Sequence, residues 1–240
     1  YPPITIYGAD PSIPAIVQPL GLAYIAGYIE MEGHIVKILD ARGKSGGRVI
    51  EEKKSSLYGL TDSEIIFEIE NFKPDVIGIS SMWTAYSGDA HRIAKLAKKC
   101  KTDMPVVFGG AHASQLFEMV LRDENVDIVV IGEGEETFAD LLRSFEKKLV
   151  VGNVKGIAYR KNGKIIKTEM RERIKDLDKI PFPARHLLDM DIYLDESEKG
   201  KFAMLSPSIP IITSRGCPQR CVFCTIHSVW GRSWYGRNAE

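Results

Sequence analysis

Residues 105–114 read Pro-Val-Val-Phe-Gly-Gly-Ala-His-Ala-Ser, and residues 127–137 read Asp-Ile-Val-Val-Ile-Gly-Glu-Gly-Glu-Glu-Thr. In each stretch a short apolar run ends at glycine and is followed by a segment with helical spacing. Strands that are apolar along their whole length are typical of a parallel sheet covered by helices. Both stretches therefore predict a β-strand that leads directly into an α-helix.

The same alternation extends over residues 1–150. It predicts strands at 4–7, 35–40, 75–80, 105–108 and 127–131, and helices at 20–32, 62–72, 90–99, 115–122 and 136–148. Five βα units with right-handed crossovers predict an α/β fold, a flavodoxin-like (Rossmann-like) doubly wound parallel five-stranded sheet. In such a sheet the ligand site lies beyond the carboxyl ends of the strands.

The pattern changes after Lys148. Runs at 154–159 and 164–168 flank Lys161-Asn162-Gly163, and Asn-Gly is a strong signal for a β-hairpin turn. Residues 170–208 carry charges and prolines without a sustained period, which indicates an irregular linker. A further strand is expected at 209–213. The predicted organisation is a first domain at 1–150, a hairpin and linker at 151–208, and a third unit at 209–240.

Three of the four cysteines lie in the stretch Cys217-Pro-Gln-Arg-Cys221-Val-Phe-Cys224. Three thiolates can hold three irons of a four-iron cluster and leave the fourth iron open for a substrate. The alternative is a zinc site of the Cys₃His type, in which His227 supplies the fourth ligand. A single CxxxCxxC that follows an apolar run and Arg215-Gly216 favours the iron-sulfur cluster.

This motif, with the aromatic residue Phe223 before its last cysteine, resembles that of the radical S-adenosylmethionine enzymes. The resemblance implies that Cys217, Cys221 and Cys224 bind a [4Fe-4S] cluster and that Phe223 packs near the adenine of S-adenosylmethionine. It also implies that the open iron takes the amino and carboxylate groups of S-adenosylmethionine. One-electron cleavage then gives a 5'-deoxyadenosyl radical.

Three further stretches, at 19–24, 109–114 and 132–137, together resemble the amino-terminal cobalamin-binding domain of one class of these enzymes. Glycines at strand ends let the backbone approach a flat ligand closely, and helix amino termini offer N–H groups. The alternative for each turn alone is ordinary strand-to-helix punctuation and core packing. The expected cobalamin contacts are Ser80, Ser81, Met82, Trp83, Gly109, Gly110, His112, Gly132, Glu133, Gly134 and Glu135.

The stretch Asp89-Ala-His91-Arg-Ile-Ala94 nearly matches the DxHxxG by which some cobalamin proteins ligate cobalt. Its last position is alanine, and it follows the third predicted strand, whereas the ligating motif follows the first. We therefore expect His91 to be a helix-surface residue and cobalt to lack a histidine ligand.

Composition excludes several classes of partner. Lys+Arg and Asp+Glu both number 32, so no net field favours nucleic acid or an anionic membrane. The apolar runs are too short to span a bilayer. The chain opens on Tyr1-Pro2-Pro3 without a signal peptide, and its clustered thiols fit a reducing compartment, so a cytoplasmic protein is expected.

A radical barrel needs about 180 residues, more than 209–240 provides. We therefore expect the amino-terminal part of an enzyme, ending in the first βα unit of a truncated partial TIM barrel and inactive alone. The resemblance implies a cobalamin-dependent radical enzyme for methyl transfer or oxidative cyclisation, close to the methyltransferases and the magnesium-protoporphyrin IX monomethyl ester cyclase. Its implied partners are an unknown small-molecule substrate and a reductase, flavodoxin or ferredoxin. The alternative function is a non-catalytic cobalamin carrier with a structural zinc site.

Overall fold

The centre of the molecule is a short parallel sheet. The computed structural model describes residues 1–7, 16–198 and 208–238. Strands β4 (Ile77–Ser80), β5 (Val106–Gly109) and β6 (Ile128–Val130) lie side by side and run parallel. Three of the five predicted parallel strands are therefore confirmed, and their carboxyl ends meet at one edge.

The predicted hairpin continues this sheet. Strand β7 (Ile157–Lys161) pairs antiparallel with β6 and then with β8 (Lys164–Lys167). Asn162 and Gly163 adopt positive φ angles of 51° and 74°, as a two-residue hairpin turn requires. Arg160 of β7 donates to the carbonyls of Leu121, Asp123, Glu124 and Val126 at 2.5–3.2 Å. The guanidinium thereby fixes the loop that leads into β6.

The prediction of a five-stranded parallel sheet is wrong in two of its strands. Strand β1 (Ile4–Tyr7) belongs to a separate antiparallel sheet of order β1-β3-β2, with β3 (Ser55–Tyr58) and β2 (Val49–Glu51). Residues 35–40 form no strand. Ile35 is 89 % exposed, and Lys37 pairs with Glu68 at 2.7 Å. This run therefore lies beside the helix at 62–72, and β1 pairs with β3, which is about 50 residues away in the sequence.

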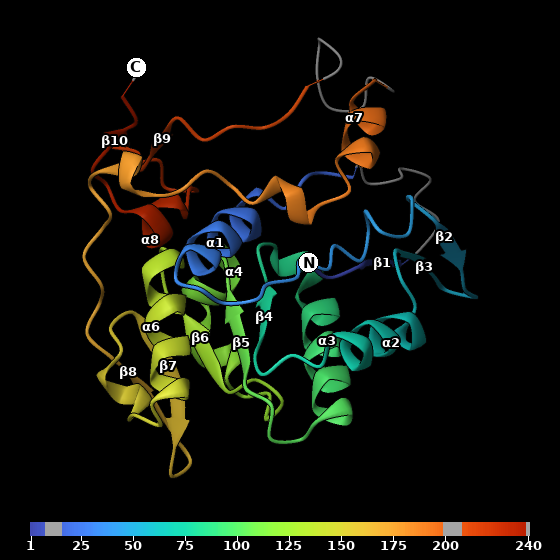
Figure 1. Cartoon of the computed structure of the whole chain (residues 1–240), viewed down its shortest axis with the longest axis horizontal. Coiled ribbons are helices and arrows are strands. Elements are labelled where there is room, and N and C mark those ends of the chain that lie inside the picture. Colours follow the sequence, from blue (N-terminus) through green and yellow to red (C-terminus); the bar gives the residue numbers. More distant parts are fainter. Residues whose placement is uncertain (8–15, 199–207, 239–240) are drawn as a thin grey trace.

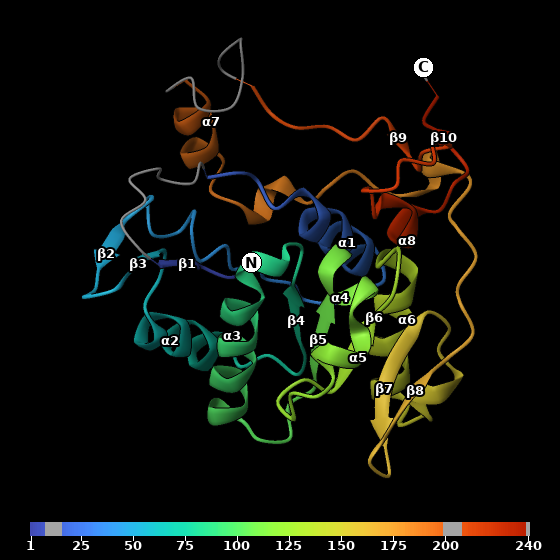
Figure 2. The same cartoon turned by 180° about the vertical axis from the view of Figure 1, so that it is seen from behind.

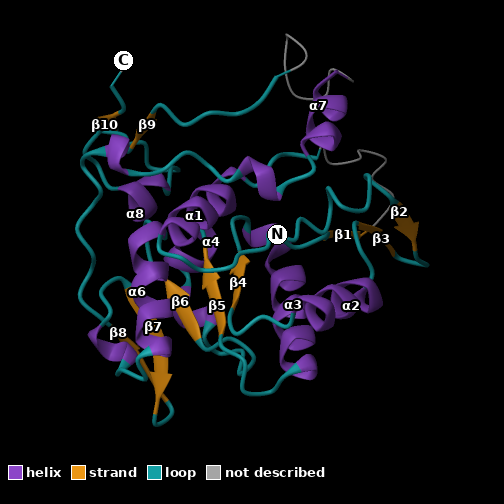
Figure 3. Cartoon of the chain, viewed as in Figure 1, coloured by secondary structure: helices purple, strands orange, loops and turns teal. Residues whose placement is uncertain are grey.

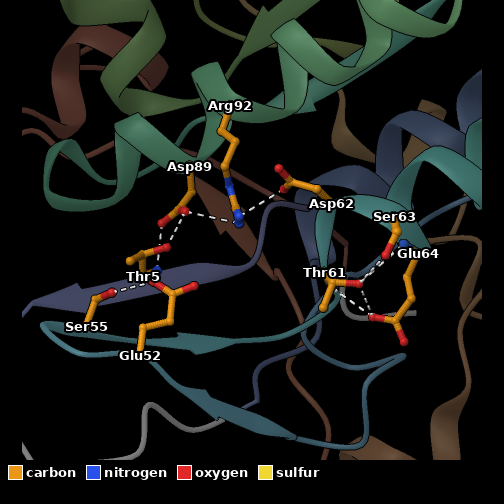
Figure 4. Close-up of polar contacts among 9 residues, drawn as sticks. All are labelled: Thr5, Glu52, Ser55, Thr61, Asp62, Ser63, Glu64, Asp89 and Arg92. Carbon is orange, nitrogen blue, oxygen red and sulfur yellow. Dashed lines mark hydrogen bonds and ion pairs between the residues drawn. The ribbon is translucent and has the colours of Figure 1, made fainter.

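The helices of the first 150 residues are α1 (Leu20–Met31), α2 (Asp62–Phe72), α3 (Ser87–Cys100), α4 (Ala111–Gln115), α5 (Phe117–Val120) and α6 (Glu135–Glu146). The predicted helices are confirmed, although the one expected at 115–122 is reduced to α5 and is preceded by α4, which was not predicted. A capping box of Thr61 and Glu64 starts α2 (Figure 4). The ion pair with Arg48, reinforced by Thr61, lowers the pKa of Glu64 to about 2. No helix of the described chain combines the length and apolarity that crossing a bilayer demands.

Buried side chains cover both faces of the main sheet, whose strands are drawn in orange among the purple helices in Figure 3. Val106 and Phe108 face α3 and α5, and the intervening Val107 faces α6, where it packs with Leu141. This alternation follows from the two-residue period of a strand, which sends successive side chains to opposite faces. The result is the expected three-layer α/β/α arrangement.

The carboxyl-terminal part crosses over α1 (Figures 1 and 2). It contains the short turns η3 (Leu177–Lys179) and η4 (Arg185–Leu187), helix α7 (Met190–Glu198), the two-residue strands β9 (Ser214–Arg215) and β10 (Tyr235–Gly236), and helix α8 (Ile226–Trp230). The linker docks by a hydrogen bond from Ala184 N to Ala23 O of α1, 2.8 Å long. Residues 199–207 of the predicted linker lie outside the described residues.

The strand expected at 209–213 is not formed. Pro210 lies within that run and has no N–H to donate to a neighbouring strand. Its carbonyl instead accepts from Arg185 at 2.7 Å. Pairing begins only at Ser214 and Arg215, which lie opposite Gly236 and Tyr235.

Candidate functional site

The three predicted ligand turns meet at one edge of the parallel sheet. The turn after β4 is tied to the end of β5, because Ser81 N donates to Gly109 O at 2.7 Å. The turn after β6 is tied to α4, because Gly132 N donates to Ser114 Oγ at 3.1 Å. The contribution of Ser114 was not predicted from the sequence. This edge faces α1 and α8 (Figures 1 and 2).

One half of this edge is open. Met82 and Trp83 are 44 % and 63 % exposed, and a Cβ atom built on Gly109 meets nothing within 4 Å. A shallow hollow lies beside them, lined by residues 1–4, 80–83 and Tyr86. It is too small to enclose a drug-sized ligand. It would therefore take only an edge of a large ring lying on an open platform.

Gly110 and Gly134 serve the packing of the protein itself. A Cβ atom on Gly110, whose φ is +105°, would lie 2.8 Å from Ser81 O. A Cβ atom on Gly134 would lie 2.8 Å from Ile25 Cδ1 of α1. At Gly110 the space that a Cβ atom would take holds backbone atoms, and at Gly134 it holds the end of the Ile25 side chain. Gly109 is the glycine that leaves room.

Two buried polar atoms at the edge lack partners among the described residues, Ser81 Oγ and His112 Nε2. The other nitrogen of the ring, His112 Nδ1, lies 3.0 Å from Thr84 Oγ1. Burial lowers the pKa of His112, so the ring is neutral at neutral pH. Buried polar atoms are normally satisfied, so these two suit a ligand that brings its own hydrogen-bonding groups.

The depressed pKa of His112 has a defined effect on stability. The unfolded-state value is 6.5 and the folded-state value is lower, so stability present above about pH 6.5 is lost as the pH falls through the folded-state pKa. We expect the melting temperature to fall more between about pH 7.5 and about pH 5.5 in the wild type than in His112→Gln. Calorimetry of both proteins checks this, and parallel pH profiles would contradict it.

The carboxylates of Glu133 and Glu135 do not face the open platform, contrary to their predicted role as ligand contacts. Glu133 Oε1 accepts from Arg215 at 2.8 Å, and Glu135 Oε1 accepts from the same guanidinium at 2.5 Å. The second oxygen of Glu133 accepts from Ile174 N at 2.9 Å. Sequence reasoning missed Arg215 as a site residue. Its only local signal was its place two residues before Cys217.

The near-motif residues Asp89 and His91 have partners of their own. Asp89 accepts from the backbone N and the hydroxyl of Thr5, both at 2.7 Å, while Arg92 bridges Asp89 to Asp62 (Figure 4). His91 Nδ1 lies 2.7 Å from Asp123 Oδ2, and its ring is 5.2 Å from that of Phe108. His91 is 27 % exposed, so it lies partly at the surface of α3 as predicted, with its ring nitrogen paired to Asp123. These contacts give both side chains structural roles.

The three motif cysteines lie on the loop between β9 and α8. Cys221 is exposed, Cys217 and Cys224 are half-buried, and Phe223 is 86 % exposed. Across the described ranges, no three His, Cys, Asp or Glu side chains are gathered closely enough to hold a metal, with or without His227. The donor set nevertheless fits an iron-sulfur cluster chemically, because three free thiols share one short accessible loop.

Comparison with known proteins identifies the first domain. Residues 11–142 match the B12 binding domain. The chain belongs to this family. The match covers α1 through most of α6, and so includes the strand-end turns described above.

Longer relatives extend the likeness beyond this domain. Cytidylyl-2-hydroxyethylphosphonate methyltransferase of Streptomyces wedmorensis is 33 % identical over the whole chain, which covers 49 % of that protein. Anaerobic magnesium-protoporphyrin IX monomethyl ester cyclase of Rubrivivax gelatinosus is 28 % identical over 88 % of the chain and 35 % of the relative. The chain thus spans half or less of the length of these relatives.

A solved structure shares the fold. The radical S-adenosylmethionine methyltransferase TsrM of Kitasatospora setae, with cobalamin and a [4Fe-4S] cluster bound, matches with a TM-score of 0.67 and 16 % identity. The match covers 93 % of this chain and 41 % of TsrM. The arrangement of the B12-binding domain with the carboxyl-terminal segment over α1 therefore belongs to a known mixed α/β fold.

Proposed function

We propose that this chain is the cofactor-holding part of a cobalamin-dependent radical S-adenosylmethionine enzyme that performs methyl transfer. The observation that carries the proposal is a single juxtaposition. A loop with three free thiols is attached, through Arg215, to the strand-end edge of a B12-binding domain. A simple cobalamin carrier needs the B12-binding domain but has no use for the loop of three thiols.

Different residues of the chain would hold the different cofactors. Cys217, Cys221 and Cys224 would ligate a [4Fe-4S] cluster, and the exposed ring of Phe223 is free to pack on the adenine of S-adenosylmethionine. Met82, Trp83 and Gly109 would form the open platform beneath a corrin, with Ser81 and His112 offering hydrogen bonds. When bound, the reduced cluster supplies the electron that cleaves S-adenosylmethionine, and cobalamin supplies a carrier for the methyl group.

Methyl transfer is favoured over oxidative cyclisation by the relatives. The methyltransferase of Streptomyces wedmorensis matches the whole chain at 33 % identity, whereas the cyclase matches 88 % of it at 28 %. Cyclisation is kept as the second candidate, since the cyclase also matches most of the chain. In either case the substrate is a small molecule and the electron comes from an external reductase, flavodoxin or ferredoxin.

Titration with hydroxocobalamin, followed by visible spectra and calorimetry, tests the cobalamin part. We expect one equivalent to bind to the wild type, and the His91→Gln variant to bind it with the same cobalt spectrum, because His91 is committed to Asp123. Loss of the spectrum only in His91→Gln would make His91 the cobalt ligand. No binding to the wild type would remove cobalamin from the proposal.

If the chain were a non-catalytic carrier, the cysteines would hold a different metal. A carrier with a Cys₃His site would retain zinc through His227, and the substitution His227→Ala would release it. The proposed cluster needs no histidine, so His227→Ala should leave the iron content of the reconstituted protein unchanged. Iron and zinc analysis of the two proteins separates the carrier from the enzyme.

A further inference from the structure

Arg215, which lies just before the cysteine loop, forms with Glu133 and Glu135 the most buried ion-pair cluster among the described residues. Its side chain is 6 % exposed, and both carboxylates that it contacts are equally buried. The guanidinium also lies 5.6 Å from the ring of Tyr24 and 5.8 Å from that of Trp230. Buried ion pairs contribute little net stability, because desolvation offsets the attraction, and their best-attested role is to fix a register.

Only Gly216 separates Arg215 from the first cysteine, Cys217. Gly216 joins Arg215 to Cys217 with a φ of +89°, and a Cβ atom there would lie 1.8 Å from Ser233 O. The backbone on this side of the loop is therefore wedged against the turn that precedes β10. A shift of Arg215 cannot be absorbed before Cys217.

The other side of the loop rests on the same strand-end turns. Helix α8 packs against α4, which follows directly after Gly110. Val229 of α8 is buried, and its carbonyl lies 3.4 Å from the position of a Cβ atom on Gly132. Both ends of the cysteine loop thus touch turns that border the open platform.

We propose that Arg215 is a positioning residue that holds the cysteine loop in one register over the strand-end turns and so sets the separation of the two cofactors. This inference rests on the proposed function only in that the loop carries the cluster. The fork of the guanidinium suits this task, because it binds two carboxylates at once and a lysine ammonium binds them as a point charge. Movement of the 132–135 turn on ligand binding would then move Cys217.

Hydrogen exchange of the chain without cofactors tests the anchoring. In Arg215→Gln we expect amides of 214–216 and 226–238 to exchange about tenfold faster or more, while those of β5 and β6 change little. The exchange rates of Arg215→Lys, which keeps the charge, should fall between those of the wild type and those of Arg215→Gln. Arg237→Gln is the matched control, because Arg237 stacks on the same Tyr24 ring at 5.8 Å but bonds the linker at Ile180 O. Equal protection in Arg215→Gln and Arg237→Gln would overturn the proposal.

Pulsed dipolar EPR on the protein loaded with cob(II)alamin and a reduced cluster tests the positioning. The cobalt–cluster distance should be narrowly distributed in the wild type and Arg237→Gln, broad in Arg215→Gln and partly restored in Arg215→Lys. An unchanged distribution in Arg215→Gln would overturn the inference while the proposed function stands. If the wild type binds no cobalamin or iron, the proposed function fails, and hydrogen exchange still decides the anchoring.

Discussion

The substitution Gly109→Leu is expected to weaken hydroxocobalamin binding about a hundredfold or more and to leave the melting temperature nearly unchanged. Gly109 ends β5 beside exposed Met82 and Trp83, and the space over its Cα atom is open. A leucine side chain there would occupy the volume into which a flat ring must descend. Isothermal titration calorimetry measures the affinity, and differential scanning calorimetry checks the fold.

The neighbouring glycine provides the matched comparison. Gly110→Ala puts a Cβ atom against Ser81 O at a positive φ, and we expect it to lower the free energy of unfolding by about 2–4 kcal/mol. Its effect on cobalamin would therefore be mixed with partial unfolding. If Gly109→Leu bound cobalamin as tightly as the wild type, the ligand would not lie over this turn.

Replacing any one of Cys217, Cys221 and Cys224 by alanine is expected to remove nearly all cluster iron from the anaerobically reconstituted protein. A four-iron cluster held by only two protein thiolates lacks the ligands to persist. Cys100→Ala is the control, because Cys100 ends α3, where burial raises the pKa of its thiol. Iron and acid-labile sulfide analysis of the four variants measures the effect.

Combining the three substitutions tests the independence of the two parts. In the part of the chain that the structure describes, the motif cysteines lie on a loop outside the main sheet, so the triple alanine variant should melt within about 2 °C of the wild type without iron. A large loss of stability would show that the loop supports the core. Retention of iron in any single variant would show that a different ligand set holds the cluster.

Local signals predicted much of the fold. The runs that became β5 and β6 are apolar and buried on both faces, and Asn162-Gly163 determines its hairpin turn by itself. The glycine turns predicted a cobalamin-binding domain, which the match to the B12 binding domain confirms. The meeting of the three turns at one edge followed from the rule that parallel strands end on the same side.

Other features depend on contacts between distant residues and have no local signal. Strand β1 pairs antiparallel with residues 55–58. The sequence of β1 by itself does not show whether it joins this partner or the parallel sheet. The role of Arg215 depends on carboxylates about 80 residues earlier. Gly109 and Gly110 are adjacent glycines that the sequence alone does not distinguish. A Cβ atom on Gly109 would project into open space, whereas a Cβ atom on Gly110 would meet Ser81 O.

Whether the three motif cysteines hold an iron-sulfur cluster is tested most directly by anaerobic reconstitution of the wild-type chain, followed by metal and sulfide analysis and EPR of the dithionite-reduced protein. We expect about four iron and four sulfide per chain and the signal of a reduced [4Fe-4S] cluster. Stoichiometric zinc bound through the same three cysteines, with no iron taken up under these conditions, would contradict this expectation.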